Sequence, residues 1–203
     1  MIKITVPATS ANLGIGYDTL GMAVSLYSHF TFERADKLTI TGCPEEFQNE
    51  NNLVYVSFVD ALAAWSEPAF PVAIDIQTDV PVARGLGSSS TCVVAGIMAA
   101  AALTGHTVDR AELVRIATEV EGHPDNVAPA ILGGAVCSFT PTDSLPQCLR
   151  YEVSDRLRFY YRDSALRGAY ERGAQGRAAG DSALHRRMAN GPHRRHDARF
   201  GDW

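Results

Sequence analysis

The chain has 203 residues, of which 46% are hydrophobic, and a formal net charge of −5, so it can bury a core in one domain, or in one domain and part of a second. Its longest apolar run, Cys92 to Leu103, is too short to span a bilayer and no signal segment is recognisable, so we expect a soluble, cytoplasmic protein. The four cysteines lack C-x-x-C spacing, which argues against zinc or a disulfide framework and favours small buried hydrophobic residues.

The first segment, residues 2–6, alternates between apolar and polar residues and predicts a strand that ends at Pro7. Residues 7–21 follow as a loop of small residues with three glycines. Asn12 offers a donor and an acceptor, and Asp18 offers a charged acceptor, which suits an amino or hydroxyl group of a small polar substrate. Ordinary turn chemistry explains these two residues equally well, because loops favour Asn and Asp.

The next part of the chain predicts strands over residues 24–32 and 38–41, and a helix over 52–65, where apolar residues recur with a 3.6-residue period. A strand over residues 72–77 then leads into a glycine-rich segment. The predicted order is therefore strand, glycine loop, helix.

The glycine-rich segment, residues 81–91, reads PVARGLGSSST and continues into an apolar run. Gly85 and Gly87 tolerate positive φ, which turns successive N–H groups to one side, and the helix behind them adds unpaired N–H groups and the positive end of its dipole. This combination predicts an anion site, most often for phosphate. The alternative is an ordinary glycine–serine turn that caps a buried helix.

Two helices are predicted after the glycines. The first runs from about Ser88 to a C-terminal glycine, Gly105. The second spans residues 110–121, with Asp109 as its N-cap and Glu112 in the position of a capping box.

The end of the second helix carries Glu119 and Glu121, where carboxylates oppose the helix dipole unless a cation lies nearby. Residues 123–134 form a polar segment held by proline and glycine, to which we assign no regular element. His123 is expected to be a loop or capping histidine, and not a catalyst. Strands are predicted over residues 135–140 and 149–153.

Three of these segments stand in a fixed order: PATSANLGIGYDTLG, PVARGLGSSST and EVEGHPDNVAPAILGG. As a set they resemble the GHMP kinase superfamily, and within it the homoserine kinase family. The resemblance covers residues 1–159 and is specific, because three ordered motifs match. The glycine–serine segment is not a Walker A loop, since no lysine follows the serines.

The resemblance implies a site for ATP and Mg²⁺. Asn52 would contact the adenine, and the phosphates would be bound by Pro81, Arg84, Gly85, Leu86, Gly87, Ser88, Ser89 and Ser90. Ser89 and Glu121 would hold the metal, with Glu119 as the alternative carboxylate. A small ligand set of this kind agrees with magnesium, which keeps few protein ligands and bridges phosphate oxygens.

The resemblance also implies the substrate L-homoserine, held by Asn12, Asp18 and Asn126, and catalytic roles for Asn126 and Arg84. The reaction would be the ATP-dependent phosphorylation of L-homoserine to O-phospho-L-homoserine in threonine biosynthesis, without a dedicated aspartate base. Another small-molecule kinase of the superfamily and a catalytically inactive nucleotide-binding fragment are the alternatives. We expect no membrane or nucleic-acid partner, and a homodimer is left open.

The fold implied for residues 1–159 is a two-layer α/β (α+β) domain of the ribosomal protein S5 domain 2 type, without the C-terminal GHMP domain that normally follows. Residues 160–203 look like an unrelated basic tail. Residues 1–155 hold 7 basic and 18 acidic residues, whereas residues 156–203 hold 11 arginines and 5 acidic residues.

We expect this tail to be disordered and to result from a shifted reading frame. Synonymous codons for residues 160–170, read one base later, can encode Ile-Ile-Val-Ile-Pro-Arg-Tyr-Glu-Val-Arg-Thr, a strand typical of the family. A genuine basic tail that binds an acidic partner is the alternative. Sequencing of the underlying DNA distinguishes the two.

Overall fold

The computed structural model describes residues 1–141, 145–154 and 156–159. The predictions for residues 160–203, a frameshifted and disordered tail, lie outside the described residues. Within the described part of the chain, no helix is long and apolar enough to cross a membrane.

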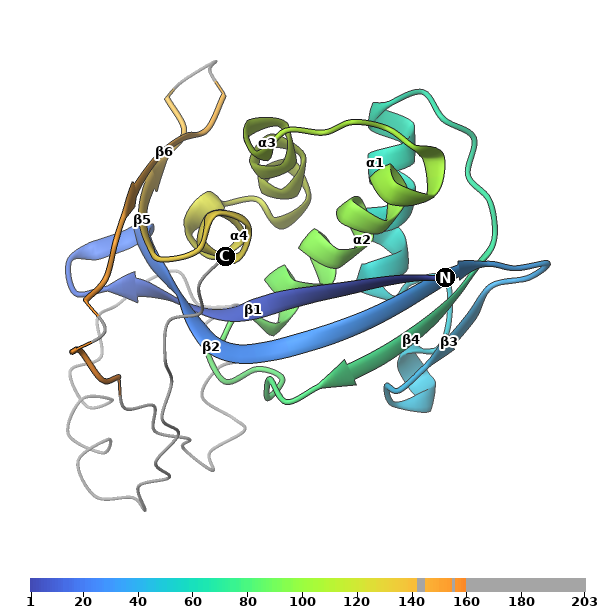
Figure 1. Ribbon diagram of the computed structural model, residues 1–203, viewed down its shortest axis with the longest axis horizontal. Helices are drawn as coiled ribbons and strands as arrows, with labels where there is room; N and C mark the ends of the chain where they lie inside the picture. The colour runs from blue at the N-terminus through green and yellow to red at the C-terminus, as the bar shows by residue number, and fades with distance from the viewer. Residues whose placement is uncertain (142–144, 155, 160–203) are drawn as a thin grey trace, which may run out of the picture.

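A mixed sheet of six strands forms one layer of the domain (Figure 1). Its path is β3-β4-β2-β5-β6, and β1 pairs with β2 on the other edge of β2. Among the strand pairs of the described residues, β3–β4 is the only parallel one. The strands are β1 (Ile2–Leu13), β2 (Gly16–Arg34), β3 (Thr39–Thr41), β4 (Val72–Thr78), β5 (Ala135–Phe139) and β6 (Gln147–Tyr151).

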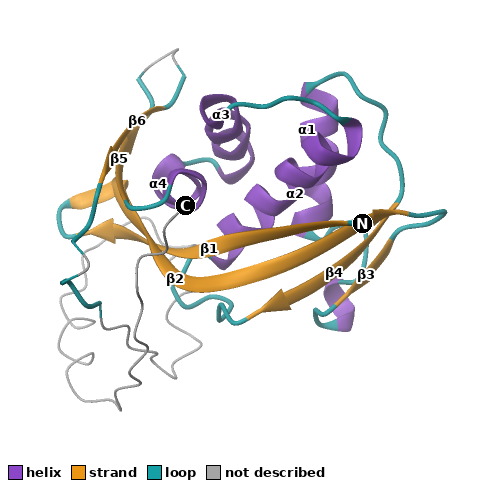
Figure 2. Ribbon diagram, viewed as in Figure 1, coloured by secondary structure: helices purple, strands orange, loops and turns teal. Residues whose placement is uncertain are grey.

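The α-helices form the second layer and lie together on one face of this sheet (Figure 2). They are α1 (Leu53–Ala64), α2 (Ser88–Thr104), α3 (Arg110–Glu121) and α4 (Pro124–Leu132), and a short 3₁₀ helix, η1 (Glu45–Phe47), precedes α1. The two-layer α/β architecture predicted from the sequence is therefore confirmed.

The helix ends follow the capping residues of the sequence. The Asn52 side chain accepts a hydrogen bond from the N–H of Val54 and caps α1. The Asp109 side chain accepts one from the N–H of Glu112 and caps α3, while Gly105 ends α2 in the left-handed conformation. The predicted order of strand, glycine loop and helix is thus β4, the loop and α2.

The first hairpin differs from its prediction. Pro7 does not end a strand: β1 continues to Leu13, and the segment predicted as a loop forms the second half of β1, the turn and the start of β2. Proline is tolerated here because β1 pairs with β2 alone among the strands that the structure describes, and its register with β2 shifts between Pro7 and Ala8. Pro7 therefore marks an irregularity within the strand and not its end.

Residues 123–134 also differ from their prediction, because most of them form α4. Pro124 stands at its first turn, where a missing N–H costs nothing. Pro129 lies five residues further on, inside a helix of nine residues. Pro129 therefore leaves the carbonyl of Asp125, four residues earlier, without its usual helical N–H partner, a cost that the tertiary packing of this buried helix must offset.

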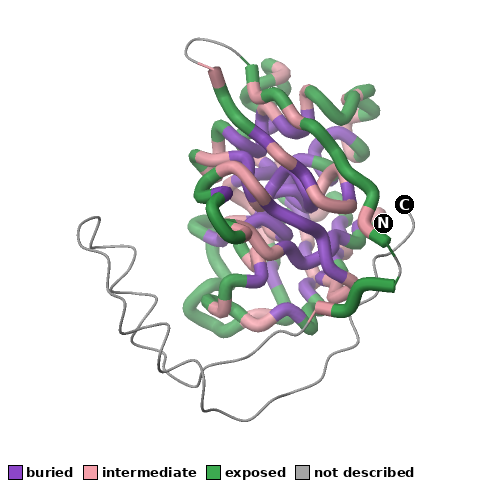
Figure 3. Tube along the Cα trace, turned by 90° about the vertical axis from the view of Figure 1, so that its left-hand side faces the viewer, coloured by how far each residue is buried: buried purple, intermediate pink, exposed green. Residues whose placement is uncertain are grey.

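The core lies between the sheet and the helices, where the buried segments gather (Figure 3). Its largest fully buried side chains are Phe30, Phe32, Phe58, Leu62, Ile74, Ile97 and Ile116. The cysteines were predicted to be small buried residues, but all four are free and only partly buried.

Candidate functional site

The glycine loop joins β4 to α2 and holds three residues with positive φ: Ala83 (56°), Gly85 (72°) and Gly87 (61°). Alternation of left-handed residues turns backbone N–H groups to a common side. Gly87 is also the N-cap of α2 and offers no side chain to the first N–H groups of that helix. Those groups, and the positive end of a helix of 17 residues, are therefore available to an anion.

Leu86 anchors this loop. Its side chain is buried in a small cluster with Ala8, Met22, Val24 and Val80, at the foot of the β1–β2 hairpin. Its carbonyl accepts a hydrogen bond from the N–H of Thr9 at 3.2 Å. The backbone on either side of Leu86 is held in place by these contacts, while Gly85 and Ser89 remain exposed.

The serines at the start of α2 face a carboxylate from α3. Ser89 Oγ donates to Glu121 Oε1 at 2.7 Å, and Ser90 Oγ donates to the same oxygen at 3.4 Å. Glu119 instead pairs with Arg115 at 2.7 Å and is 61% exposed. Of the two carboxylates considered from the sequence, Glu121 is the one brought to the glycine loop.

Cys92 is a partly buried thiol near the start of α2. Burial raises its pKa to about 11; the hydrogen bond with Thr91 opposes this rise, and the charges of Glu121 and Cys43 add smaller increases. Among the described residues, no group of three or more His, Cys, Asp or Glu side chains is arranged to hold a metal ion. A cation at Glu121 and Ser89 would therefore take most of its ligands from a bound phosphate and water, as magnesium does.

Asn126 stands in the first turn of α4, directly beside the glycine loop. Its Oδ1 accepts a hydrogen bond from Thr9 Oγ1 at 2.9 Å. A Cβ at Gly87 would lie 2.0 Å from Thr9 Oγ1 and 3.2 Å from Asn126 Oδ1, so these three residues are in close contact. Thr9 was missed by the sequence analysis, because a threonine in a predicted loop of small residues carries no distinguishing signal.

Asn12 and Asp18 lie at the exposed tip of the β1–β2 hairpin. Both have left-handed φ, 58° and 51°, which is unusual for residues with a side chain. The N–H of Asp18 donates to Asn12 Oδ1 at 2.9 Å, so the two residues form one local unit. The charge of Asp18 reaches His123, whose pKa it helps to raise.

His123 is the N-cap residue of α4, but its side chain makes no capping bond. Its Nδ1 lies 2.5 Å from Asp125 Oδ1, and Asp125 is fully buried. That hydrogen bond, and the charges of Asp125, Glu121 and Asp18, raise the pKa of His123 above its ordinary value against the opposing effect of burial. The imidazole therefore lies within electrostatic reach of both Glu121 and the hairpin tip.

The remaining predicted residues are placed as follows. Pro81 opens the glycine loop, and Arg84 lies within it, partly exposed. Asn52 is buried; besides capping α1, its Nδ2 donates to the carbonyl of Phe47 at 2.8 Å. Among the described residues, no hydrogen bond joins Asn52 to the glycine loop, so it stands apart from the cluster formed by the loop, Glu121 and Asn126.

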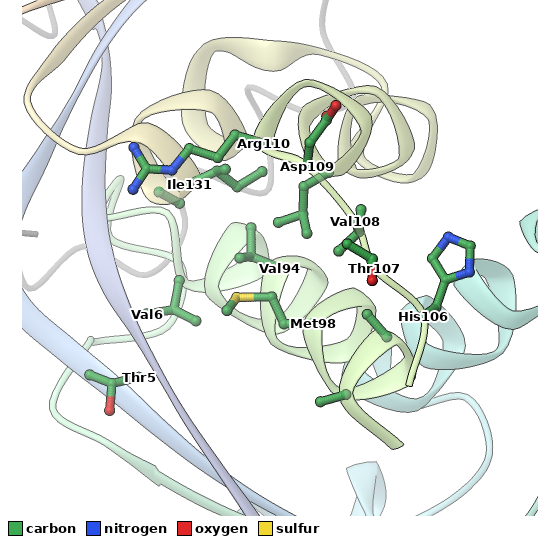
Figure 4. A pocket seen from close by; sticks show the side chains of 14 residues that line it. Thr5, Val6, Val94, Met98, His106, Thr107, Val108, Asp109, Arg110 and Ile131 are labelled. Atoms are coloured by element: carbon green, nitrogen blue, oxygen red, sulfur yellow. The ribbon is translucent and has the colours of Figure 1, made fainter. Parts of the chain in front are cut away.

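A groove of about 470 Å³ lies elsewhere, between β1 and the helices α2, α3 and α4. Figure 4 shows Val94 and Met98 of α2 beside it, with Val6 of β1 and Ile131 of α4. None of the residues that line it is among the predicted site residues.

Residues 52–134 match the family model described as the GHMP kinases N terminal domain. The match includes α1, the glycine loop, Glu121 and α4, but not the β1–β2 hairpin that carries Thr9, Asn12 and Asp18. Residues 52–134 are therefore similar to the N-terminal domain of the GHMP kinases.

The chain is also similar to homoserine kinases. It is 43% identical over 160 residues to the homoserine kinase of Clostridium botulinum (strain Okra / Type B1), covering 78% of this chain and 54% of that protein. It is 50% identical over 139 residues to that of Clostridium beijerinckii, covering 67% and 46%. The homoserine kinase structure from Cytophaga hutchinsonii superposes with a TM-score of 0.64 at 29% identity, covering 76% and 52%. The chain thus spans about half the length of the curated relatives it matches.

Proposed function

We propose that this chain provides the ATP-binding half of a homoserine kinase. The enzyme would transfer the γ-phosphoryl group of ATP to the side-chain hydroxyl of L-homoserine, giving O-phospho-L-homoserine for threonine biosynthesis in the cytoplasm. The observation that carries the proposal is the contact of Ser89 Oγ with Glu121 Oε1, at 2.7 Å, behind a loop with alternating positive φ. Similarity to the Clostridium homoserine kinases supports the choice of substrate.

The glycine loop would bind the nucleotide. Backbone N–H groups of residues 85–90 would hold the phosphates, Arg84 would add positive charge, and Asn52 would contact the adenine. Ser89 and Glu121 would hold Mg²⁺, which when bound neutralises charge on the phosphate oxygens. The Ser89 hydroxyl and the Glu121 carboxylate are already hydrogen-bonded to each other at the positive end of α2.

The hairpin tip and α4 would bind the acceptor. Asn12 and Asp18 suit the amino group of an amino acid, and Asn126 suits its hydroxyl. The hydroxyl oxygen would form the new bond to phosphorus as the bond to the β–γ bridging oxygen breaks and ADP leaves, and the hydroxyl proton would pass to water or to the transferred phosphoryl group. Alignment and charge neutralisation can supply the rate without an aspartate base.

A coupled ADP-release assay with L-homoserine, L-threonine and mevalonate tests this proposal. We expect turnover with L-homoserine, and the phosphorylated product identified by mass spectrometry. Turnover with mevalonate alone would assign the chain to another GHMP small-molecule kinase. ATP binding in calorimetry, without turnover of any acceptor, would favour the inactive nucleotide-binding fragment.

A further inference from the structure

Thr9 connects three separate elements of the site. It lies in β1 and is completely buried. Its backbone N–H donates to the carbonyl of Leu86 in the glycine loop at 3.2 Å, and its Oγ1 donates to Asn126 Oδ1 in α4 at 2.9 Å. One residue of the sheet therefore fixes the distance between the loop and the helix.

The contact between these groups is direct. A Cβ at Gly87 would come within 2.0 Å of Thr9 Oγ1, so the loop backbone packs against the hydroxyl itself. The Thr9 hydroxyl therefore lies between the loop backbone at Gly87 and the Asn126 amide.

The hydroxyl determines which end of the Asn126 amide faces the site. Oδ1 accepts from Thr9, and Nδ2, with its two N–H groups, has no hydrogen-bond partner among the described residues. The Asn126 side chain is only partly buried. Asn126 therefore offers donors, and not its carbonyl, to a group that enters beside the glycine loop.

We propose that Thr9 is a positioning residue of the phosphoryl-transfer site. It orients the Asn126 amide so that Nδ2 donates to the hydroxyl oxygen of the acceptor, at a fixed distance from the phosphate-binding loop. Thr9 acts through Asn126 and touches no substrate itself. This inference rests on the proposed kinase function for the identity of the acceptor, but the link from Thr9 to Asn126 can be tested without it.

The test compares Thr9→Val with Thr9→Ser, and uses Thr5→Val as the matched control in the same strand. Valine keeps the shape of threonine and the N–H bond to Leu86 but removes the hydroxyl. We expect it to shift the Asn126 side-chain amide signals in ¹⁵N NMR spectra and to lower kcat/KM for L-homoserine at least about tenfold. The affinity for ATP should stay close to that of the wild type, because the loop keeps its backbone contact.

Thr9→Ser should restore both the amide signals and turnover. Thr5→Val should change neither, since the Thr5 hydroxyl contacts His29 on the open face of the sheet. As a second variant, Asn126→Asp keeps an oxygen for Thr9 and removes the two donors, so it should abolish turnover in a folded protein. If Thr9→Val does not fold, the turnover of Asn126→Asp is measured in its place.

Unmoved amide signals in Thr9→Val, or equal losses in Thr9→Val and Thr9→Ser, would overturn the proposal and reduce Thr9 to a packing residue. Full turnover in Asn126→Asp would also overturn it. Wild-type protein that phosphorylates no alcohol would refute the proposed function, and the NMR comparison would then decide the Thr9 link alone.

Discussion

Glu121 ends α3, where its carboxylate opposes the dipole of its own helix. The structure resolves this unfavourable placement, because the same carboxylate accepts hydrogen bonds from the serines in the first turn of α2. The positive end of one helix thus offsets the negative end of the other. A carboxylate held in this way is ready to share a cation with a phosphate bound at α2.

Replacement of Glu121 by Gln keeps the shape and removes the charge. We expect it to weaken Mg²⁺ affinity in the presence of ATP at least about tenfold, the lower end of what loss of even an outer-shell partner costs. Titration of ATP turnover or ATP binding with Mg²⁺ measures this. Glu119→Gln is the matched control, since Glu119 pairs with Arg115 on the surface, and equal effects in the two variants would remove Glu121 from the metal site.

The raised pKa of His123 makes the stability of the protein depend on pH. This pKa is raised above 6.5, first by the hydrogen bond to Asp125. The protonated imidazole therefore contributes stability that is present below pH 6.5 and is lost as the pH rises through the raised pKa. Asp125→Asn removes the main cause, so an NMR titration of the His123 ring should give a lower pKa in the folded protein.

Asp18→Asn is the control for this titration. It removes only the last and weakest of the charges that raise the pKa of His123, so its effect should be smaller than that of Asp125→Asn. A His123 pKa that is the same in Asp125→Asn and in the wild type would contradict the assignment of the hydrogen bond.

The glycine loop requires its two glycines for different reasons. A Cβ at Gly85 would meet nothing within 4 Å, so Gly85→Ala carries only the cost of positive φ, roughly 1–2 kcal/mol. Gly87→Ala carries the same cost and forces the loop away from Thr9 and Asn126. We expect urea unfolding to give a larger loss of stability for Gly87→Ala, together with weaker ATP binding. Equal losses would show that the loop moves aside freely.

The N-terminus of α1 allows a separate test of Asn52. Asn52→Ala should lower the free energy of unfolding by about 1–2 kcal/mol, because it removes the helix cap. The neighbouring Asn51→Ala, at an exposed position, should change it by less than about 0.5 kcal/mol. If Asn52 also contacts the adenine, its variant should weaken ATP binding after correction for the folded fraction.

Periodicity and caps predicted most elements of this fold. Leu53–Ala64, Ser88–Thr104 and Arg110–Glu121 follow closely from apolar spacing and from Asn52, Gly105 and Asp109. The two largest errors involve proline: β1 runs past Pro7, where its end was predicted, and α4, which was not predicted, contains Pro129. Local propensity fails at these positions because pairing with β2 and packing in the core outweigh it. The short 3₁₀ helix Glu45–Phe47 was also missed.

The site was predictable only where chemistry gives a local signal. Glycines before serines indicate an anion loop. The sequence alone does not distinguish Glu121 from Glu119, because the difference lies in their contacts: Glu121 bonds Ser89, and Glu119 pairs with Arg115. The roles of Thr9 and Asp125 depend on contacts with α4 and with the hairpin that no local pattern records. The other assignments of site residues stay predictions.

At the scale of the whole molecule, the open face of the sheet is divided in two. Where β1 and β2 run beside β3 and β4, it carries hydrogen-bonded polar side chains, such as Thr5 with His29 and Thr41 with Asp75. On β5 and β6 it exposes large apolar ones, Phe139, Leu149 and Tyr151, at 44%, 56% and 54%. Contiguous apolar surface of this kind favours association.

Leu149→Lys should therefore reduce self-association of this chain in sedimentation experiments without changing its fold. Gln77→Lys, on the polar half of the same face, is the control and should leave association unchanged. A wild-type chain that stays monomeric at every concentration, or an unchanged Leu149→Lys variant, would contradict this expectation.

The register shift after Pro7 has a consequence for the parity of β1. Before it, Ile4 and Val6 face the helices, so even-numbered side chains point into the core. After it, Thr9 meets Asn126 of α4, so odd-numbered side chains do. A strand without the shift would point the Thr9 hydroxyl to the opposite side of the sheet. Straightening this strand would therefore disconnect the site from the sheet, even with every site residue still present in the sequence.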